Sequence, residues 1–284
     1  MSVQQARDLR EQGMVQICGT EQGLGAIDKV ARYMTPPPPV RPTAAYPGIG
    51  LRESLSSERT HLTMNEFDAK QLLAAYGLPV TRERLVNDLD GAKIAAKEVG
   101  YPVVLKVVSD EVPHKTEFGL VIIEIKNENE LASEFEKLIQ RIDGMNPRPT
   151  KYNYLVQEFV REGVEVFAGL SRDPNFGLVL AFGTGGIGIE ISKDFALRML
   201  PLRECDAEAM IAEAKGAALL GAVRGGPPAD TRAAAACLTQ LADFALHNEE
   251  FLHEVDLNPI KVLSEGKGCV VVDALIVAKE RQEA

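Results

Sequence analysis

From residue 63 onward, the hydrophobic positions of the chain follow helical and strand-like spacing in turn. Thr63 and Glu66 have the spacing of a capping box, which predicts that a helix begins there. The apolar residues that follow lie on one helical stripe and are Phe67, Leu72, Leu73 and Tyr76. Gly77 ends this pattern, and a second helix is predicted over 89–99.

Runs of apolar residues predict strands in the middle of the chain, because short runs bounded by turn residues are typical of buried strands. The predicted strands are 101–109, 120–126, 153–160, 164–172 and 177–183. Amphipathic or Ala-rich segments predict further helices over 128–142, 207–221 and 229–247. Helices and strands mix without strict βαβ repetition, which indicates an α/β or α+β fold in two lobes.

The C-terminal residues 253–277 have the pattern of two strands joined by the sequence SEGKG. If Glu265–Gly266 is a two-residue turn, the register of the whole hairpin follows. That register places Asn258 opposite Asp273, with Asp256 on the same face. Directly opposed Cβ atoms lie about 4.5–5.5 Å apart, so two oxygen ligands there could share one Mg²⁺. The alternative is a polar hairpin end that faces water.

Two basic residues stand out in and after the apolar segment 103–108. Lys106 lies at its centre, where a lysine is costly unless it is paired or meets an anion. It indicates either a phosphate-binding group or an edge strand whose lysine reaches water. His114 follows in a loop between Pro113 and Gly119, and imidazole can accept and return a phosphoryl group near neutral pH. The alternative for His114 is an ordinary solvated loop histidine.

A glycine-rich segment follows the predicted strand 177–183, with glycines at Gly183, Gly185, Gly186 and Gly188. Glycines allow backbone N–H groups to approach phosphate oxygens and form an anion-binding nest. The segment is neither a Walker loop nor a GxGxxG motif, and the alternative is a tight hairpin turn.

Composition limits the remaining classes of protein. The 284 residues have a formal net charge of −10, which argues against a general affinity for nucleic acid. No apolar run has the length of a membrane span, and four dispersed cysteines favour a reduced, cytoplasmic protein. Residues 35–48 are rich in proline. Residues 1–60 are therefore predicted to be an N-terminal tail and linker before a packed domain over 61–284, whose smaller lobe covers about 80–155.

Five segments in this order resemble the ATP-grasp half of the NDP-forming acyl-CoA synthetases, relatives of succinyl-CoA synthetase. They are VVLKVVSDEVPHKTEFGLV, VQEFVREGVEVFAG, AFGTGGIGIE, LLGAVRG, and VDLNPI with VVVDA. The resemblance covers about Thr63–Ala278 and implies an ATP-grasp fold of two lobes. It also implies an acid–thiol ligase of the ADP-forming acetate–CoA type, in which acyl-CoA, phosphate and ADP are converted reversibly to a carboxylic acid, CoA and ATP.

The resemblance implies roles for individual residues. His114 has the position of a second phosphoryl carrier, which follows a histidine of the CoA-binding half, and Asp256 has that of an acid that orients the phosphohistidine. Lys106 matches a lysine that contacts nucleotide phosphates, while Asn258 and Asp273 match Mg²⁺ ligands. Further contacts with ATP or ADP are expected at Gln157, Glu158, Phe159, Glu165, Gly183, Gly185, Gly186 and Arg224.

The sequence also departs from the family pattern. Leu120 stands where the family commonly has glycine, which is expected to stiffen the loop that contains His114. These residues do not contain a complete CoA-binding half, so we expect a CoA-binding, alpha-like subunit or domain that brings the acyl-CoA or carboxylic acid substrate. Two alternatives are an ATP-grasp carboxylate ligase without a histidine relay and a non-catalytic nucleotide-binding regulatory module. The acyl group and the choice between ATP and GTP stay open.

Overall fold

The structure is a computed structural model that describes residues 63–109, 111, 118–185, 195–222 and 226–279, together with Leu24 and Leu51. The chain divides into two units, Met1–Arg41 and Pro42–Ala284, and the elements named below belong to the second. Apart from those two leucines, the predicted tail lies outside the described residues, so its boundary with the packed domain stays a prediction. Within the described part of the chain, we find no helix with the length and apolar character needed to cross a bilayer.

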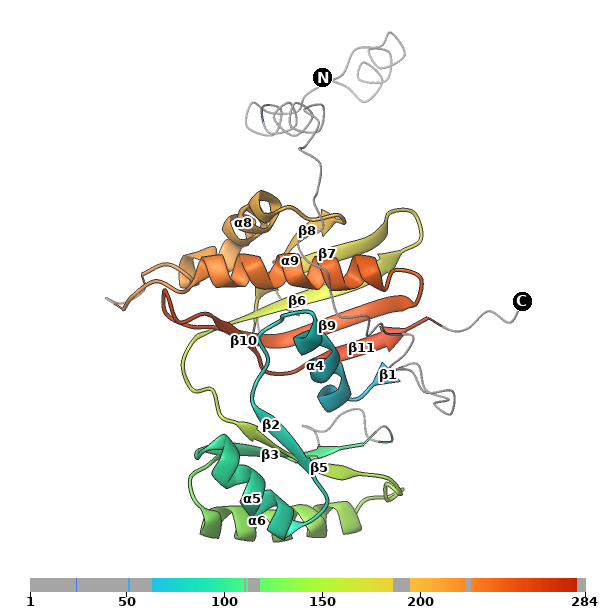
Figure 1. The fold of residues 1–284 in the computed structure, drawn as a ribbon, viewed down its shortest axis with the longest axis vertical. Helices are drawn as coiled ribbons and strands as arrows, with labels where there is room; N and C mark the ends of the chain where they lie inside the picture. Colours follow the sequence, from blue (N-terminus) through green and yellow to red (C-terminus); the bar gives the residue numbers. More distant parts are fainter. Residues whose placement is uncertain are drawn as a thin grey trace, which may run out of the picture. The chain divides into compact units, whose positions relative to one another are not determined.

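A seven-stranded antiparallel sheet forms the larger lobe (Figure 1). The strand order is β1-β11-β9-β6-β7-β8, and β10 also pairs with β9. The strands are β1 (Thr63–Met64), β6 (Val164–Asp173), β7 (Gly177–Thr184), β8 (Phe195–Met199), β9 (Leu252–Val262), β10 (Cys269–Val271) and β11 (Leu275–Ala278). Strand β9 pairs with β6, β10 and β11, so the C-terminal hairpin lies inside this sheet.

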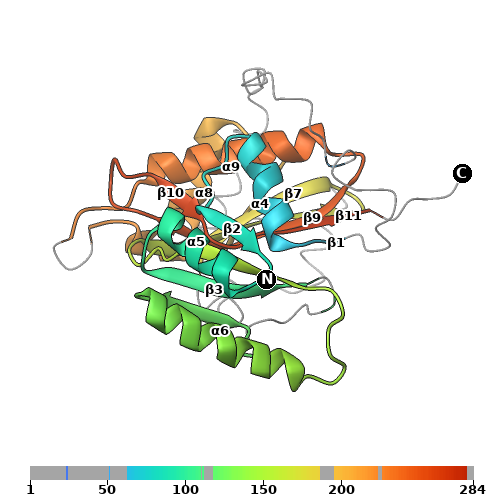
Figure 2. The same ribbon diagram turned by 60° about the horizontal axis from the view of Figure 1, so that its bottom comes forward.

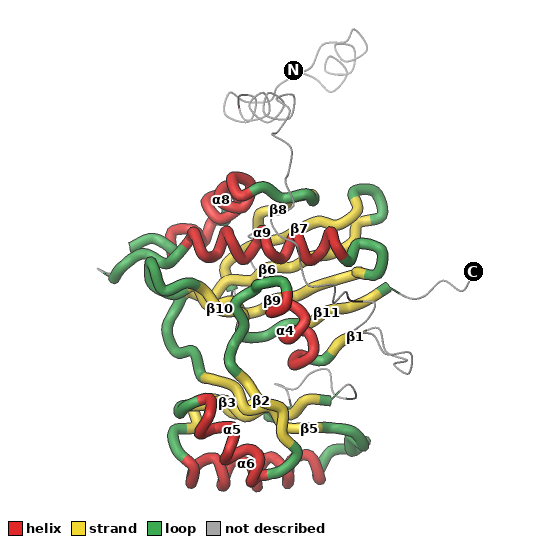
Figure 3. Tube along the Cα trace, in the orientation of Figure 1, coloured by secondary structure: helices red, strands yellow, loops and turns green. Residues whose placement is uncertain are grey.

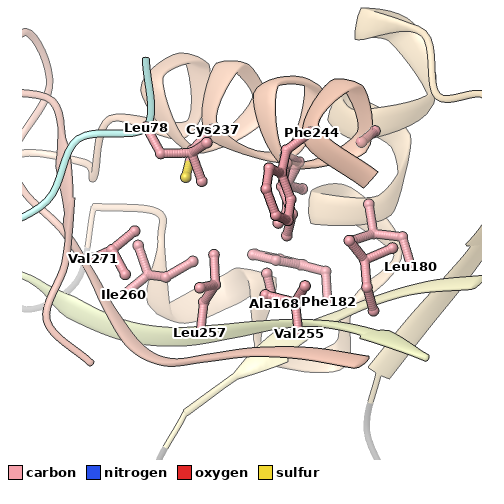
Figure 4. Packing of buried hydrophobic residues seen from close by; sticks show 14 of the residues in the cluster. Leu78, Ala168, Leu180, Phe182, Cys237, Phe244, Val255, Leu257, Ile260 and Val271 are labelled. Atoms are coloured by element: carbon pink, nitrogen blue, oxygen red, sulfur yellow. The ribbon is translucent and has the colours of Figure 1, made fainter. Parts of the chain in front are cut away.

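Helices pack on this sheet, and their apolar side chains form the hydrophobic core of the larger lobe together with those of the strands. They are α4 (Glu66–Ala75), α8 (Glu204–Glu213), a short 3₁₀ helix (Lys215–Leu219) and α9 (Thr231–His247). Helices α8 and α9 lie along β7, β8 and β9, while α4 lies beside β11 (Figure 3). Figure 4 shows Phe244 of α9 above Phe182, Leu257 and Val255 of the sheet. The ring of Tyr76, which follows α4, meets Phe244 edge-on with ring centroids 5.0 Å apart, so α4 is anchored in the larger lobe.

The smaller lobe has its own sheet and its own core. Its antiparallel strands are β2 (Glu83–Val86), β3 (Val103–Val108), β4 (Val121–Ile125) and β5 (Asn153–Glu158), in the order β2-β5-β3-β4. Helices α5 (Leu89–Val99) and α6 (Glu128–Asp143) cover one face of this sheet (Figure 2). The buried stripe of α6 consists of Leu131, Phe135, Leu138 and Ile142. The predicted two-lobed mixture of helices and strands is confirmed.

Some local predictions are wrong. Helix α4 begins at Glu66 because the side chain of Asn65, one residue earlier, accepts a hydrogen bond from the Asp68 N–H at 3.0 Å. Thr63 instead belongs to β1 and pairs with Val277. The predicted helix 207–221 is α8 followed by the 3₁₀ helix, with Ala214 in extended conformation between them. Strands β2 and β8 were not predicted.

Candidate functional site

Lys106 is buried at the centre of the smaller sheet. Strand β3 lies between β5 and β4, so the edge-strand interpretation of this lysine is wrong. Only 6% of the residue is exposed, and its Nζ donates a hydrogen bond to Glu66 Oε1 at 2.6 Å. Lys106 belongs to the smaller lobe, whereas Glu66 is the first residue of α4, which packs on the larger lobe. The ion pair therefore joins the two lobes.

Electrostatics keep Lys106 positively charged. Burial alone lowers its pKa, but the carboxylates of Glu66, Asp273 and Glu83 outweigh burial and hold the pKa above its usual value. Asp273 is the predicted metal ligand of the C-terminal hairpin. The chain thus places a charged lysine within the electrostatic range of the predicted metal site.

A second buried lysine lies beside this ion pair. Lys70 Nζ donates to Glu66 Oε1 at 2.9 Å and to Thr81 Oγ1 at 3.2 Å, and it also forms a salt bridge with Glu83. Lys70 Nζ also donates a hydrogen bond to the Val272 carbonyl at 3.0 Å. Burial raises the pKa of the Glu83 carboxyl, although Lys70 opposes this shift. Two lysines and two glutamates thus balance their charges in a buried network.

Gln157 completes this network from strand β5. Its side chain is fully buried, and Nε2 donates at 2.9 Å to both Thr81 Oγ1 and the Val272 carbonyl. Among the residues that the structure describes, none forms a hydrogen bond with the buried Oε1 atom of Gln157, so this atom is available to a polar group of a ligand. A nucleotide contact at Gln157 stays a prediction.

The hairpin register predicted from the SEGKG turn is confirmed. Gly266 has φ +78°, which suits glycine, and the Lys267 N–H donates to the Ser264 carbonyl at 2.9 Å. Farther along, Val271 pairs with Ile260 and Leu275 pairs with Asp256, as the predicted register requires. Asn258 and Asp273 occupy the interval between these two paired segments.

The middle of β9 and the segment between β10 and β11 carry acidic and amide side chains. Burial, followed by the charges of Glu254 and Asp273, raises the pKa of the Asp256 carboxyl. Among the described residues, no group of three or more His, Cys, Asp or Glu side chains is arranged as a complete metal site. Mg²⁺ usually takes only one or two carboxylates from the protein and completes its shell with substrate phosphates and water. Asn258 and Asp273 fit that partial donor set, and mutual repulsion in the acidic group favours a cation.

The other predicted nucleotide contacts lie where the chain passes from β5 to β6, in the glycine-rich segment after β7, or outside the described residues. Glu158 pairs with Arg82 at 2.8 Å, and the guanidinium of Arg161 lies 5.8 Å from the Phe159 ring centroid. Glu165 pairs with Lys261 at 2.8 Å. These contacts leave the predicted nucleotide roles untested.

The glycine segment begins where β7 ends. Gly183 is still part of β7, and the Gly185 N–H donates to the Glu165 carbonyl at 2.8 Å. A Cβ on Gly185 would approach the Glu165 backbone to 3.2 Å, which explains glycine there. Gly183 pairs with Phe195 of β8, so the connection is far longer than a tight hairpin turn. The remaining candidates lie outside the described residues and are His114, Gly186, Gly188 and Arg224.

Sequence reasoning missed most of the buried network. Glu66 was interpreted only as part of a helix cap, and Lys70, Thr81 and Glu83 were not singled out. The only local signal is the four-residue spacing of Glu66 and Lys70, which is typical of exposed helix pairs. Leu120, where glycine was expected, is buried in the core of the smaller lobe.

Comparisons with known proteins show the family of this chain. The family model of the ATP-grasp domain matches residues 53–278. The beta subunit of ADP-forming acetate–CoA ligase II from Pyrococcus furiosus is 38% identical over 229 residues, which are 81% of this chain and 96% of that subunit. ADP-forming acetate–CoA ligase I from Archaeoglobus fulgidus is 38% identical over 209 residues, but the match spans 74% of this chain and only 30% of that protein.

Solved structures of an acetyl-coenzyme A synthetase are also similar to this chain. Acetyl-coenzyme A synthetase 1 from Ca. Korarchaeum cryptofilum, in complex with coenzyme A and Ca-AMPCP, is 39% identical and has a TM-score of 0.72 over 76% of this chain and 93% of that one. A second structure of that enzyme contains coenzyme A and Mg-AMPPCP, with its phosphohistidine segment pointing towards the nucleotide-binding site. It is 38% identical with a TM-score of 0.67, over 76% of this chain and 93% of that one.

The family predicted from five sequence motifs is confirmed, as is its class, the acid–thiol ligases. The length of the match shows which part of these enzymes corresponds to this chain. The matched residues cover 96% of the Pyrococcus beta subunit but only 30% of the longer Archaeoglobus ligase. The chain belongs to the ATP-grasp family, in the branch formed by the beta subunits of ADP-forming acyl-CoA synthetases.

Proposed function

We propose that this chain is the nucleotide-binding half of an ADP-forming acyl-CoA synthetase of the acetate–CoA type. It moves a phosphoryl group between ADP and a phosphohistidine, and the phosphohistidine exchanges that group with an acyl phosphate. In the complete enzyme, acyl-CoA, phosphate and ADP give a carboxylic acid, CoA and ATP. The observation that supports this function best is the buried Lys106, which the negative charges of Glu66 and Asp273 keep in its charged form.

The residues divide into three proposed roles. Lys106 contacts nucleotide phosphates, and Asn258 and Asp273 hold Mg²⁺. A bound Mg²⁺ supplies charge neutralisation to the transferred phosphoryl group. His114 accepts and returns the phosphoryl group, and Asp256 orients the phosphohistidine.

Nucleotide contacts from the other predicted residues belong to the same proposal. Glu158, Phe159 and Glu165 lie at the end of β5 and the start of β6, where the chain passes from the smaller to the larger sheet. A partner subunit is implied by relatives named as beta subunits. We propose that this partner binds CoA and the acyl substrate, and that the pair works in the cytoplasm.

Replacing Lys106 with alanine is expected to weaken ADP binding in the presence of Mg²⁺ by about 1.5–3 kcal/mol, as for a lost hydrogen bond to a charged group. Isothermal titration calorimetry of the full chain measures this change. Lys137→Ala is the matched control, because Lys137 is an exposed lysine of the same lobe that pairs only at the surface with Glu134. Equal ADP affinity in Lys106→Ala and wild type would assign Lys106 to the structural network alone.

A further inference from the structure

The buried network contains groups from both lobes. Glu66 and Lys70 are part of α4, whose apolar face belongs to the core of the larger lobe. Lys106 and Gln157 are part of β3 and β5 in the smaller sheet. Both carboxylates are almost fully buried, with Glu66 4% and Glu83 3% exposed. Burying charges is costly, so their presence here calls for a reason beyond lobe packing.

The geometry gives Glu66 a specific relation to Lys106. An ammonium group has three N–H donors, and the 2.6 Å bond to Glu66 Oε1 uses one of them. The same oxygen also accepts from Lys70 at 2.9 Å. Glu66 is therefore held on one side by Lys70 while it fixes the position of the Lys106 ammonium on the other. A long, flexible lysine held in this way loses little freedom when it meets an anion.

The same network reaches the hairpin. Lys70 Nζ and Gln157 Nε2 both donate to the Val272 carbonyl, at 3.0 and 2.9 Å. Val272 directly precedes Asp273, so these two bonds hold the backbone from which Asp273 projects. One set of buried bonds thus sets the position of Lys106 relative to that of Asp273.

We propose that Glu66 is a positioning residue for nucleotide phosphates, which acts by holding the Lys106 ammonium at a fixed place relative to Asp273. This inference rests on the proposed nucleotide-binding function. Glu66 itself does not touch the nucleotide. Glu83, in contrast, contacts Lys70 and Thr81 and serves to balance the charge of Lys70. The two buried glutamates therefore have different effects on ligand binding, although both support the fold.

The test compares ADP with adenosine, because only ADP has phosphates for Lys106 to meet. Calorimetry or competition binding in the presence of Mg²⁺ gives the ratio of the two affinities for the full chain. In Glu66→Gln, we expect this ratio to fall about tenfold or more, as for a misplaced charge-assisted hydrogen bond. Glu83→Gln is the matched control, because it removes the salt bridge to Lys70 and leaves the Glu66–Lys106 hydrogen bond in place. We expect its ratio to stay within about twofold of wild type, since its effect on the fold acts on both ligands alike.

Glu66→Asp keeps the test decisive if Glu66→Gln does not fold. It keeps the charge, but a side chain shorter by one methylene cannot reach both lysines at the observed distances. We expect a smaller fall in the ADP-to-adenosine ratio than for Glu66→Gln. A wild-type ratio in the folded Glu66 variants, or an equal fall in Glu83→Gln, would overturn the positioning role. Failure of the wild-type chain to bind ADP at all would instead contradict the proposed function.

Discussion

Replacing Asp273 with alanine is expected to abolish Mg²⁺-dependent phosphoryl transfer and to leave the fold intact. Asp273 lies between the Val271–Ile260 and Leu275–Asp256 pairs of the hairpin, and its Oδ1 accepts a hydrogen bond from the N–H of the adjacent Ala274 at 2.8 Å. The strands on both sides stay paired without its side chain. Loss of a metal ligand removes several kcal/mol of transition-state stabilisation, and about 4 kcal/mol corresponds to roughly a thousandfold in rate. Asn258→Ala is expected to act in the same direction.

The measurement is phosphoryl transfer as a function of Mg²⁺ concentration, together with the thermal unfolding of each variant. Glu265→Ala is a suitable control, because Glu265 is an exposed residue in the turn of the same hairpin. Wild-type rates in Asp273→Ala at limiting Mg²⁺ would contradict the metal-ligand assignment. An unfolding temperature far below that of Glu265→Ala would show that Asp273 serves the hairpin instead.

Replacing His114 with alanine is expected to remove most of the acyl-CoA turnover in a system that contains a CoA-binding partner, with little loss of ADP affinity. A covalent carrier contributes to the reaction path and makes no large ground-state contact with the nucleotide. The chain alone is expected to give no acyl-CoA turnover, because in the proposed function the partner binds CoA and the acyl substrate. Turnover assays with and without the partner, combined with ADP titration, separate these effects.

His253→Ala provides a control for the loss of a histidine, since His253 is exposed on β9 of the larger lobe. If partner-dependent turnover in His114→Ala stays near the wild-type rate, His114 is an ordinary loop histidine. The phosphoryl group would then pass directly between the nucleotide and the acyl phosphate.

The parts of the site that sequence could predict depend on local chemistry. The turn at Glu265–Gly266 set the register of the hairpin, because a two-residue turn allows only one pairing of the strands that flank it. Pairing of Val271 with Ile260 and of Leu275 with Asp256 followed from that turn alone. The buried face of α6 followed in the same way from its helical spacing.

The buried network could not be predicted as a whole because the bonds that connect its helix, its strands and the hairpin join residues that are distant in the sequence. Lys106 and Glu66 are 40 residues apart, and Gln157 and Val272 are 115 residues apart. The pattern around Lys106 indicated that it needed a partner but did not specify which one. Strand β8 was missed for another reason, because Phe195, Leu197 and Met199 are exposed and do not mark a buried strand.

Labelling with ATP tests the central claim most directly, since it follows the phosphoryl group on this chain without any partner. The chain is incubated with Mg²⁺ and γ-labelled ATP, and the label is then located by peptide mapping. We predict a base-stable, acid-labile label on the peptide that contains His114, and its loss in both His114→Ala and Asp273→Ala. Absence of label from the wild-type chain, or equal labelling of His114→Ala, would contradict the proposed transfer between nucleotide and histidine.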